Sequence, residues 1–279
     1  MAGSLYIVAT PIGNLEDVTL RALRILKEAD LIAAEDTRHT RILLGHYDIR
    51  TPLISYHEHN EKAQAPKLVQ RLLRGENIAL VADAGTPAIA DPGYRLVVEA
   101  VRAGVMVHPL PGPSALAAAL SASGLPTDRF TFEGFLPAKQ GERQHKLEAL
   151  RNESRTLVFY EAPHRLKEAL ADLRRVLGDR ELVVAREVSK VHEEFLRGTI
   201  DEVLAGVADR EVKGEITMVV RGAVGGAAVS EQELNAEIER LADEGIGVKE
   251  ISEVLGERYQ LAKREVYKLA LRHKERQKT

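Results

Sequence analysis

Residues 78–93, IALVADAGTPAIADPG, decide the fold class. The first five residues are apolar and lead into a loop built from small residues, Gly and Pro. Asp91 followed by Pro92 is typical of a helix N-cap with Pro at the first helical position, so we expect a helix that runs to about Arg102. A strand, a short Gly/Pro turn and a helix form one repeating unit of an α/β sheet.

The same pattern recurs on both sides of this stretch. Strands are expected at residues 5–9, 31–34 and 105–110, and a single helix at residues 15–29. Strands that alternate with helices across short turns predict a parallel sheet covered by helices. Because ligands of such sheets bind beyond the carboxyl ends of the strands, the loops there are the first candidates for a site.

A second block follows, with less regular spacing and helices expected near residues 142–151 and 165–176. We interpret it as a second α/β domain with a mixed sheet. Its strand candidates are residues 130–132, 156–160, 182–186, 194–199 and 216–220. Residues 223–229 are small and featureless, as in a linker. The expected domains are therefore residues 1–115 and 116–222, with residues 230–279 as a C-terminal extension.

The extension is expected to be helical. Residues 230–233 (SEQE) form a capping box, and three short helices follow, the second of them broken at Gly256. Between residues 258 and 279, eight Lys or Arg stand against two Glu. A basic last helix after a tight turn is a helix-turn-helix pattern, which favours nucleic acid. An amphipathic tail that packs on the body or on a partner subunit is the alternative.

Composition excludes several classes of protein. There is no Cys, which removes disulfides, thiolate zinc sites and iron–sulfur clusters, and net charge is −3. The N-terminus lacks the pattern of a signal peptide, and no apolar run approaches the ~20 residues that span a bilayer. His57 and His59 are two residues apart, a poor spacing for metal ligands on a helix. We expect a soluble, cytoplasmic protein without a metal site.

Four expected strand ends carry unusual residues. Residues 10–15 (TPIGNL) stand where a dinucleotide fingerprint would, but they are not G-x-G-x-x-G and do not indicate NAD or FAD. In the EDTR segment, either Asp36 or Thr37 caps a helix, or the charged residues of the segment face a substrate. Asp83 is suited to accept hydrogen bonds from hydroxyls or an amine. Ser114 begins a helix whose free N–H groups suit a carboxylate, although close packing explains its small neighbours equally well.

Taken together, six segments in order resemble the ribosomal RNA small subunit methyltransferase I group of the tetrapyrrole methylase superfamily. They are residues 5–15 (LYIVATPIGNL), 34–38 (AEDTR), 83–93 (DAGTPAIADPG), 109–114 (PLPGPS), 159–165 (FYEAPHR) and 185–194 (AREVSKVHEE). The resemblance covers about residues 5–220, and the end of the chain resembles the helix-turn-helix extension of the group.

The resemblance implies a two-domain α/β fold that holds S-adenosylmethionine in the cleft between domains. It implies 2′-O-methylation of a cytidine ribose in small-subunit (16S) ribosomal RNA, either naked or in the assembled subunit, by a homodimer. Carried over position by position, the residues around the methyl donor are Pro11, Gly13, Asp83, Gly85, Thr86, Ile89, Ser114, Ala115, Tyr160, Glu161 and Ala162.

Methyl transfer from a sulfonium is an in-line displacement that depends on alignment, and a weakly acidic ribose hydroxyl needs a base or a cation nearby. The polar residues nominated to face the acceptor are Glu35, Asp36, Arg38, Glu161, Glu187 and Lys190. Arg38 and Lys190 would hold phosphate or stabilise an alkoxide, and one carboxylate would take the proton. The alternatives are that Glu161 only caps a helix and that Glu187 and Lys190 form a surface pair.

The candidate RNA-binding residues are Arg258, Lys263, Arg264, Lys268 and Arg272. Two other functions remain open at this point. A relative of the same fold could methylate carbon atoms of a tetrapyrrole-like ring, because fold alone does not select the substrate. A helix-turn-helix regulator whose α/β body senses a metabolite would bind duplex DNA and transfer no methyl group.

Overall fold

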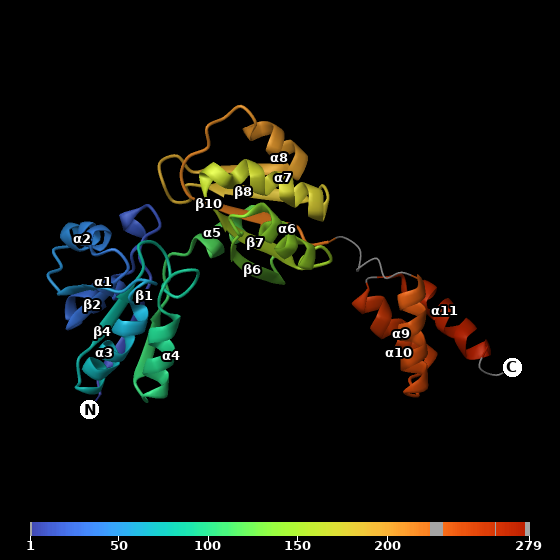
Figure 1. The fold of residues 1–279 in the computed structure, drawn as a ribbon, viewed down its shortest axis with the longest axis horizontal. Helices are drawn as coiled ribbons and strands as arrows, with labels where there is room; N and C mark the ends of the chain where they lie inside the picture. The colour runs from blue at the N-terminus through green and yellow to red at the C-terminus, as the bar shows by residue number, and fades with distance from the viewer. Residues whose placement is uncertain (1, 224–230, 260, 277–279) are drawn as a thin grey trace. The chain divides into compact units, whose positions relative to one another are not determined.

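The computed structural model describes residues 2–223, 231–259 and 261–276 (Figure 1). It divides into two compact units that are not continuous in sequence. The first comprises Met1–Ala122, Ala185–Phe195 and Gly214–Thr217, and the second comprises Ser123–Val184, Leu196–Lys213 and Met218–Thr279. Two short segments from late in the chain therefore pack with the N-terminal part.

The first unit contains a five-stranded sheet in the order β3-β2-β4-β1-β5, in which all neighbouring strands are parallel. Its strands are β1 (Ser4–Val8), β2 (Leu31–Ala34), β3 (Leu53–Ser55), β4 (Ile78–Val81) and β5 (Met106–Leu110). Every residue of β2 and β4 is buried, as expected for parallel strands covered on both faces. The predicted parallel sheet is confirmed, with β3 as an additional strand.

Helices cover both faces of this sheet. They are α1 (Leu20–Glu28), α2 (Thr37–His46), α3 (Glu61–Leu73) and α4 (Tyr94–Arg102), and a further helix, α5 (Ala115–Ser123), follows β5. Along β2, Leu31 and Ala33 belong to an apolar cluster with residues of α3 and α4, whereas Ile32 and Ala34 belong to one with residues of α1 and α2. Successive strand residues point to opposite faces, so each helix pair covers its own face (Figure 1).

Two details of the first unit differ from the expectations. The single helix predicted over residues 15–29 is wrong, because a 3-10 turn, η1 (Leu15–Asp17), ends in extended backbone at Val18 and Thr19 caps α1 anew. The N-cap predicted at Asp91 is also wrong. Helix α4 begins at Tyr94 with Gly93 as its N-cap, at a φ of 146°. The left-handed backbone before it, at Ala88 and Ala90, delays the start of the helix.

The second sheet has the order β6-β7-β10-β8-β9, and it is mixed, as predicted. Its strands are β6 (Phe130–Phe135), β7 (Thr156–Glu161), β8 (Glu181–Arg186), β9 (Glu194–Thr199) and β10 (Ile216–Val220). The helices between them are α6 (Gln140–Ala149), η2 (Pro163–Arg165), α7 (Leu166–Leu177) and α8 (Ile200–Val207). Every strand predicted in this block is found.

Three helices end the chain: α9 (Glu231–Asp243), α10 (Val248–Arg258) and α11 (Lys263–Arg276). They share their own buried cluster, which contains Leu234, Ile238, Leu241, Ile251, Leu255, Val266 and Ala270. The predicted break at Gly256 is wrong, because α10 continues through it. A Cβ there would lie 3.2 Å from Cγ of Lys263, so this glycine lets α10 pack closely against the next segment. The predicted capping box begins at Ser230, outside the described residues.

Across the part of the chain that the structure describes, every helix is too short or too polar to cross a bilayer.

Candidate functional site

Loops from different strands of the first sheet are joined at its carboxyl edge. The backbones of Thr10, after β1, and Gly85, after β4, exchange two hydrogen bonds with N–O distances of 2.9 and 3.0 Å. The Thr10 hydroxyl also donates to the carbonyl of Ala82 at 3.1 Å. These bonds fix the loop after β1 against the loop after β4.

The loops after β2 and β5 join the same junction. The amide of Asp36 donates to Oδ1 of Asp83 at 2.9 Å, and the Thr86 hydroxyl donates to the carbonyl of Pro113 at 3.3 Å. A Cβ at Gly112 would lie 2.8 Å from that of Ala9, so only glycine permits this approach. The structure thus brings together the four strand ends that the sequence singled out.

The loop after β4 has an unusual backbone. Gly85, Ala88, Ala90 and Gly93 all have left-handed φ values, 82°, 67°, 63° and 146°. Such a conformation costs an alanine of the order of 1 kcal/mol and persists only where the surroundings enforce it, which is common at ligand sites. Ile89, between the two alanines, is 43% exposed. The loop therefore presents backbone and one apolar side chain, not bulky groups.

Carboxylates concentrate around this junction. Burial raises the pKa of Glu35, and the neighbouring charge of Asp83 adds to the effect. Burial also raises the pKa of Asp91 to about 7, with further contributions from Glu35, Asp83 and Glu215. No pattern in the sequence pointed to Asp91 beyond its interpretation as a helix cap. Partly buried carboxylates at one edge of a sheet favour a cationic ligand.

Asp36 and Arg38 form a local pair at the start of α2. Asp36 is the N-cap of this helix and accepts a hydrogen bond from the amide of Arg38 at 2.8 Å. The guanidinium of Arg38 binds the same carboxylate, with Nη2 2.7 Å from Oδ2, and lowers the pKa of Asp36. The Arg38 side chain is 85% exposed. Capping, one of the two roles expected for Asp36, is therefore observed, and Arg38 is open to solvent.

The segment around Lys190 lies against the loop after β1. Nζ of Lys190 is 2.9 Å from Oε1 of Glu187 and 3.1 Å from Oε2 of Glu215. A Cβ at Gly13 would lie 2.2 Å from Cγ of Lys190, so the lysine stem occupies the place of a side chain there. The Ser189 hydroxyl bonds to the carboxylate of Asp17. Glu187 and Lys190 thus form a partly buried pair, and not a fully exposed one.

The carboxylates of Glu187 and Glu215 stabilise the positive charge on Lys190. Burial opposes protonation of the amine, but the hydrogen bonds and charges of Glu187 and Glu215 outweigh it and raise the pKa of Lys190. Glu187 shows the converse: burial opposes its ionisation, and the bond to Lys190 still lowers the pKa of Glu187. The pair is therefore ionised at neutral pH.

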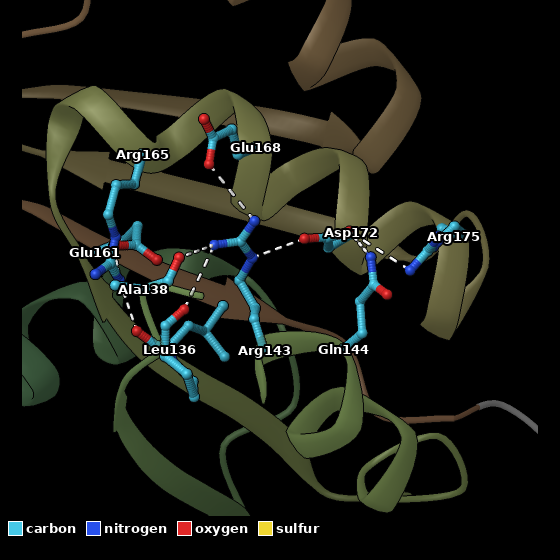
Figure 2. A network of polar contacts seen from close by, with 10 residues as sticks. Leu136, Ala138, Arg143, Gln144, Glu161, Arg165, Glu168, Asp172 and Arg175 are labelled. Atoms are coloured by element: carbon cyan, nitrogen blue, oxygen red, sulfur yellow. Dashed lines mark hydrogen bonds and ion pairs between the residues drawn. The ribbon is translucent and has the colours of Figure 1, made fainter. Parts of the chain in front are cut away.

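In the second unit, Glu161 at the end of β7 is enclosed (Figure 2). Its side chain is 0% exposed, and Oε1 accepts hydrogen bonds from the amide of Ala162 and from Nε of Arg165, each at 2.8 Å. Burial raises the pKa of Glu161, and Oε2 has no hydrogen-bond partner among the described residues. Glu161 is therefore tied to Ala162 and Arg165, but it does not cap the helix as the alternative expected, because the N-cap of η2 is Ala162 and carries no side-chain cap hydrogen bond.

Figure 2 also shows a network that the sequence did not indicate. Arg143 of α6 is 1% exposed and donates through Nε to Oδ2 of Asp172 of α7 at 2.7 Å. Its Nη1 donates to the carbonyl of Ala138 at 3.1 Å, while Arg165 donates to that of Leu136 at 2.6 Å. Two guanidiniums thus hold the loop that follows β6.

This loop leads directly from an aromatic cluster. The ring of Tyr160, one of the predicted donor-site residues, lies edge-on to Phe132 and Phe135, with centroids 4.9 and 5.7 Å away. Phe135 is 54% exposed. The buried network therefore positions the backbone next to Tyr160.

The remaining predicted residues are placed as follows. Ser114 precedes α5 and accepts a hydrogen bond from the amide of Ala117 at 3.4 Å, so it acts as a cap. Lys263, Arg264, Lys268 and Arg272 are exposed on α11. The side chain of Arg258 lies outside the described residues.

Comparison with known proteins supports this reading of the fold. The family model "Tetrapyrrole (Corrin/Porphyrin) Methylases" matches residues 4–204. Among solved structures, a uroporphyrin-III C-methyltransferase from Thermus thermophilus, complexed with S-adenosylhomocysteine, has a TM-score of 0.55 at 23% identity and covers 78% of this chain and 97% of its own. The cobalt precorrin-4 methyltransferase CbiF has a TM-score of 0.57 at 18% identity and covers 78% and 94%. At these identities the likeness shows the fold.

Curated relatives are more similar. Ribosomal RNA small subunit methyltransferase I of Synechocystis sp. is 49% identical over 272 residues, which are 96% of this chain and 98% of the relative. The protein of that name from Halalkalibacterium halodurans is 54% identical over 220 residues, 79% and 76% of the two chains. The predicted family and fold class are confirmed. The chain belongs to the tetrapyrrole methylase family and, within it, to the ribosomal RNA small subunit methyltransferase I group.

Proposed function

We propose that this chain transfers the methyl group of S-adenosylmethionine to the 2′-hydroxyl of a cytidine ribose in small-subunit ribosomal RNA. Membership of a methyltransferase family, and the names of relatives that are 45–54% identical, support methyl transfer to this RNA. The nucleotide and the sugar hydroxyl rest on the resemblance of the sequence motifs. The observation that carries the proposal is the junction of four strand-end loops in the first unit.

The junction fits the chemistry of the donor. S-adenosylmethionine has a sulfonium cation, an amine and a ribose diol, and the carboxylates of Glu35, Asp83 and Asp91 favour cations and hydroxyl donors. The small residues of the loop after β4 leave room for a flat ligand against the backbone. We infer that the donor is held by Pro11, Gly13, Asp83, Gly85, Thr86, Ile89, Ser114 and Ala115 in the first unit, and by Tyr160, Glu161 and Ala162 in the second.

When bound, the donor supplies an electrophilic methyl group, and the chain must orient the ribose hydroxyl and remove its proton. Lys190 remains protonated, so its role is to stabilise the developing alkoxide or to hold a phosphate, and not to act as a base. Arg38 is exposed and suited to a backbone phosphate.

The nominated carboxylates differ in their suitability as the base. The pKa values of Asp36 and Glu187 are lowered, since each is engaged by a cation, whereas the pKa of Glu35 is raised by burial. A base works best when its pKa lies near the working pH. Burial also raises the pKa of Glu161, but Arg165 engages its carboxylate. We therefore propose Glu35 as the proton acceptor, with Asp36 and Glu187 positioning Arg38 and Lys190.

The test incubates the protein with labelled donor and small subunits from a strain that lacks this methylation. The product is mapped by mass spectrometry and by resistance of the adjacent phosphodiester to alkali, which marks a 2′-O-methyl group. A methyl group on a base would contradict the sugar assignment. Transfer to a tetrapyrrole instead, or duplex-DNA binding without transfer, would establish one of the two alternative functions.

The oligomeric state of the chain and the form of its RNA substrate can be measured separately. Sedimentation measures whether the chain is a homodimer, as the resemblance implies. Comparison of naked RNA with assembled subunits as substrates shows which of the two is recognised. We propose that the enzyme acts in the cytoplasm, where that substrate is found.

A further inference from the structure

The three C-terminal helices separate charge between them. Among their described side chains, α9 and α10 carry five carboxylates and two cations, whereas α11 and the residues before it carry five cations and one carboxylate. Because exposed charges are screened within about 8–10 Å, such a separation gives α11 a local positive field in a chain whose net charge is −3.

Among the described side chains, the cations of α11 form no ion pairs. Arg240 of α9 pairs with Glu237 and with Glu244, at 3.3 and 2.5 Å. In the described part of α11, by contrast, no cation has an ion pair, although all are exposed. They are Lys263, Arg264, Lys268, Arg272 and Lys274. A row of unpaired cations on one helix suits a polyanion.

An apolar stripe lies among these cations. Tyr267 is 42% exposed and Leu271 is 39% exposed, and as residues four apart they share one face of α11. Val266 and Ala270, each about 100° around the helix from the residue that follows it, belong to the buried cluster, whereas Tyr267 and Leu271 are partly open to solvent. At 100° per residue, Lys263 and Lys274 border the stripe on one flank, and Arg264 and Lys268 on the other.

From this arrangement we infer that Tyr267 and Leu271 form a stacking platform for an unpaired nucleobase of the RNA, while the flanking cations hold the phosphates on either side. The inference rests on the proposed RNA substrate. A duplex needs only the cations, because its bases are stacked on one another; an exposed aromatic ring within a basic face is the feature that recognises a splayed base. The platform therefore selects single-stranded or looped RNA over a duplex of equal charge.

The test measures binding of the full chain to a fluorescent unpaired ribo-oligomer and to an RNA duplex with the same number of phosphates. Tyr267→Ala should weaken binding to the unpaired oligomer by about 5- to 100-fold, the range for loss of one stacked base, with little change for the duplex. Tyr267→Phe keeps the ring and should remain within about threefold of the parent. Val254→Ala, which trims an apolar residue on α10 that is 37% exposed, is the matched control and should have no effect.

A salt titration separates stacking on Tyr267 from the phosphate contacts of the cations. Tyr267→Ala should leave the salt dependence unchanged, whereas Lys268→Ala should reduce the slope by about 0.7 log units per log unit of salt. The inference is overturned if Tyr267→Ala, verified as folded by circular dichroism, binds the unpaired oligomer as tightly as the parent, or weakens duplex binding equally. It is also overturned if the substitution changes self-association in sedimentation but not RNA affinity. RNA binding that depends on Tyr267 without any methyl transfer would instead contradict the proposed function alone.

Discussion

Gly13 and Lys190 are far apart in the sequence, yet the lysine stem lies where a side chain at residue 13 would be. Gly13→Ala should destabilise the fold by about 1–3 kcal/mol, because it combines a φ of 151° with a Cβ placed 2.2 Å from Cγ of Lys190. Urea denaturation measures the change. In α2, Gly45→Ala meets nothing within 4 Å and is the control that should be neutral or slightly stabilising.

The clash itself can be isolated with a double-mutant cycle. Adding Lys190→Ala to Gly13→Ala removes the obstructing stem, so the double variant should lose less stability than the two single variants together. If the losses of stability in the two single variants simply add, the strained backbone of Gly13, and not its contact with Lys190, causes the loss in Gly13→Ala.

The buried carboxyl of Asp91 makes the stability of the fold decrease as the pH rises. Its pKa is raised to about 7 by burial, while the unfolded chain titrates near the ordinary value of 3.8. Between these values the folded state binds the proton better, so the ionisation of Asp91 costs stability increasingly from pH 4 to pH 7 and by a constant amount above it. Asp91→Asn should therefore stabilise the protein above pH 7, by about 1–2 kcal/mol after allowance for solvent screening, and hardly at all near pH 4.

Thermal melts of Asp91→Asn at pH 4 to 8 measure this difference. Asp209→Asn, on an exposed turn, is the control and should behave as the parent at every pH. A benefit of equal size at pH 4 and pH 8 would contradict the assignment, because only a titrating carboxyl gives a pH-dependent gain.

Single residues of the site were only partly predictable. Asp83 and Gly85 could be named because they follow an apolar strand at the edge where ligands bind. The resemblance of one motif led to Lys190, but its contact with Gly13 depends on packing between distant segments. Asp91 was misread because Asp-Pro is a common helix start, and the left-handed alanines before it leave no mark in the sequence.

At the scale of elements, α6 and α7 are linked by a buried ion pair. Without the guanidinium of Arg143, the buried Asp172 would keep its hydrogen bond from Gln144 but lose its close ion pair, and the carbonyls of Pro137 and Ala138 would lose a donor. Arg143→Met should therefore cost about 3–5 kcal/mol of unfolding free energy, measured in urea. Arg143→Lys should recover little, since one ammonium cannot reproduce the planar fork of donors.

A control lies one turn earlier, next to the same helix. Lys139 pairs with Glu142 at 3.1 Å, but their side chains are 82% and 61% exposed. Lys139→Met should change stability by less than about 0.5 kcal/mol. If Arg143→Met were no more costly than this control, the network in Figure 2 would not hold the loop after β6.

Strands were easier to predict than helix ends. Short apolar runs between turn residues identified every strand except β3, whose three residues are only partly buried. Helix α3 was not predicted, since Pro66 interrupts a polar stretch that becomes helical by packing Leu68 and Leu72 on the sheet. The boundary at Thr19 carried a visible signal, because Thr is a favoured N-cap, but the apolar spacing across it suggested one continuous helix.

At the scale of the whole molecule, the two compact units are defined by contacts between segments that lie far apart in the sequence. Ala185–Phe195 and Gly214–Thr217 pack with the N-terminal unit although they include the ends of β8, β9 and β10 of the second sheet. The expected boundary at residue 115 used composition and turn residues alone, which cannot show such exchanges. The same segments carry Glu187, Lys190 and Glu215, so part of the first unit's polar site is supplied from late in the chain.

The buried clusters of the first sheet and of the last three helices share no residue. A chain that ends at residue 229 should therefore keep the core of the first sheet and bind the methyl donor with a Kd within about threefold of the full chain, as measured by calorimetry. It should lose most RNA methylation, because α11 carries the unpaired cations and the Tyr267 platform. Full methylation by the shortened chain would remove α11 from substrate recognition, while loss of donor binding together with lower thermal stability would show that the core depends on these helices.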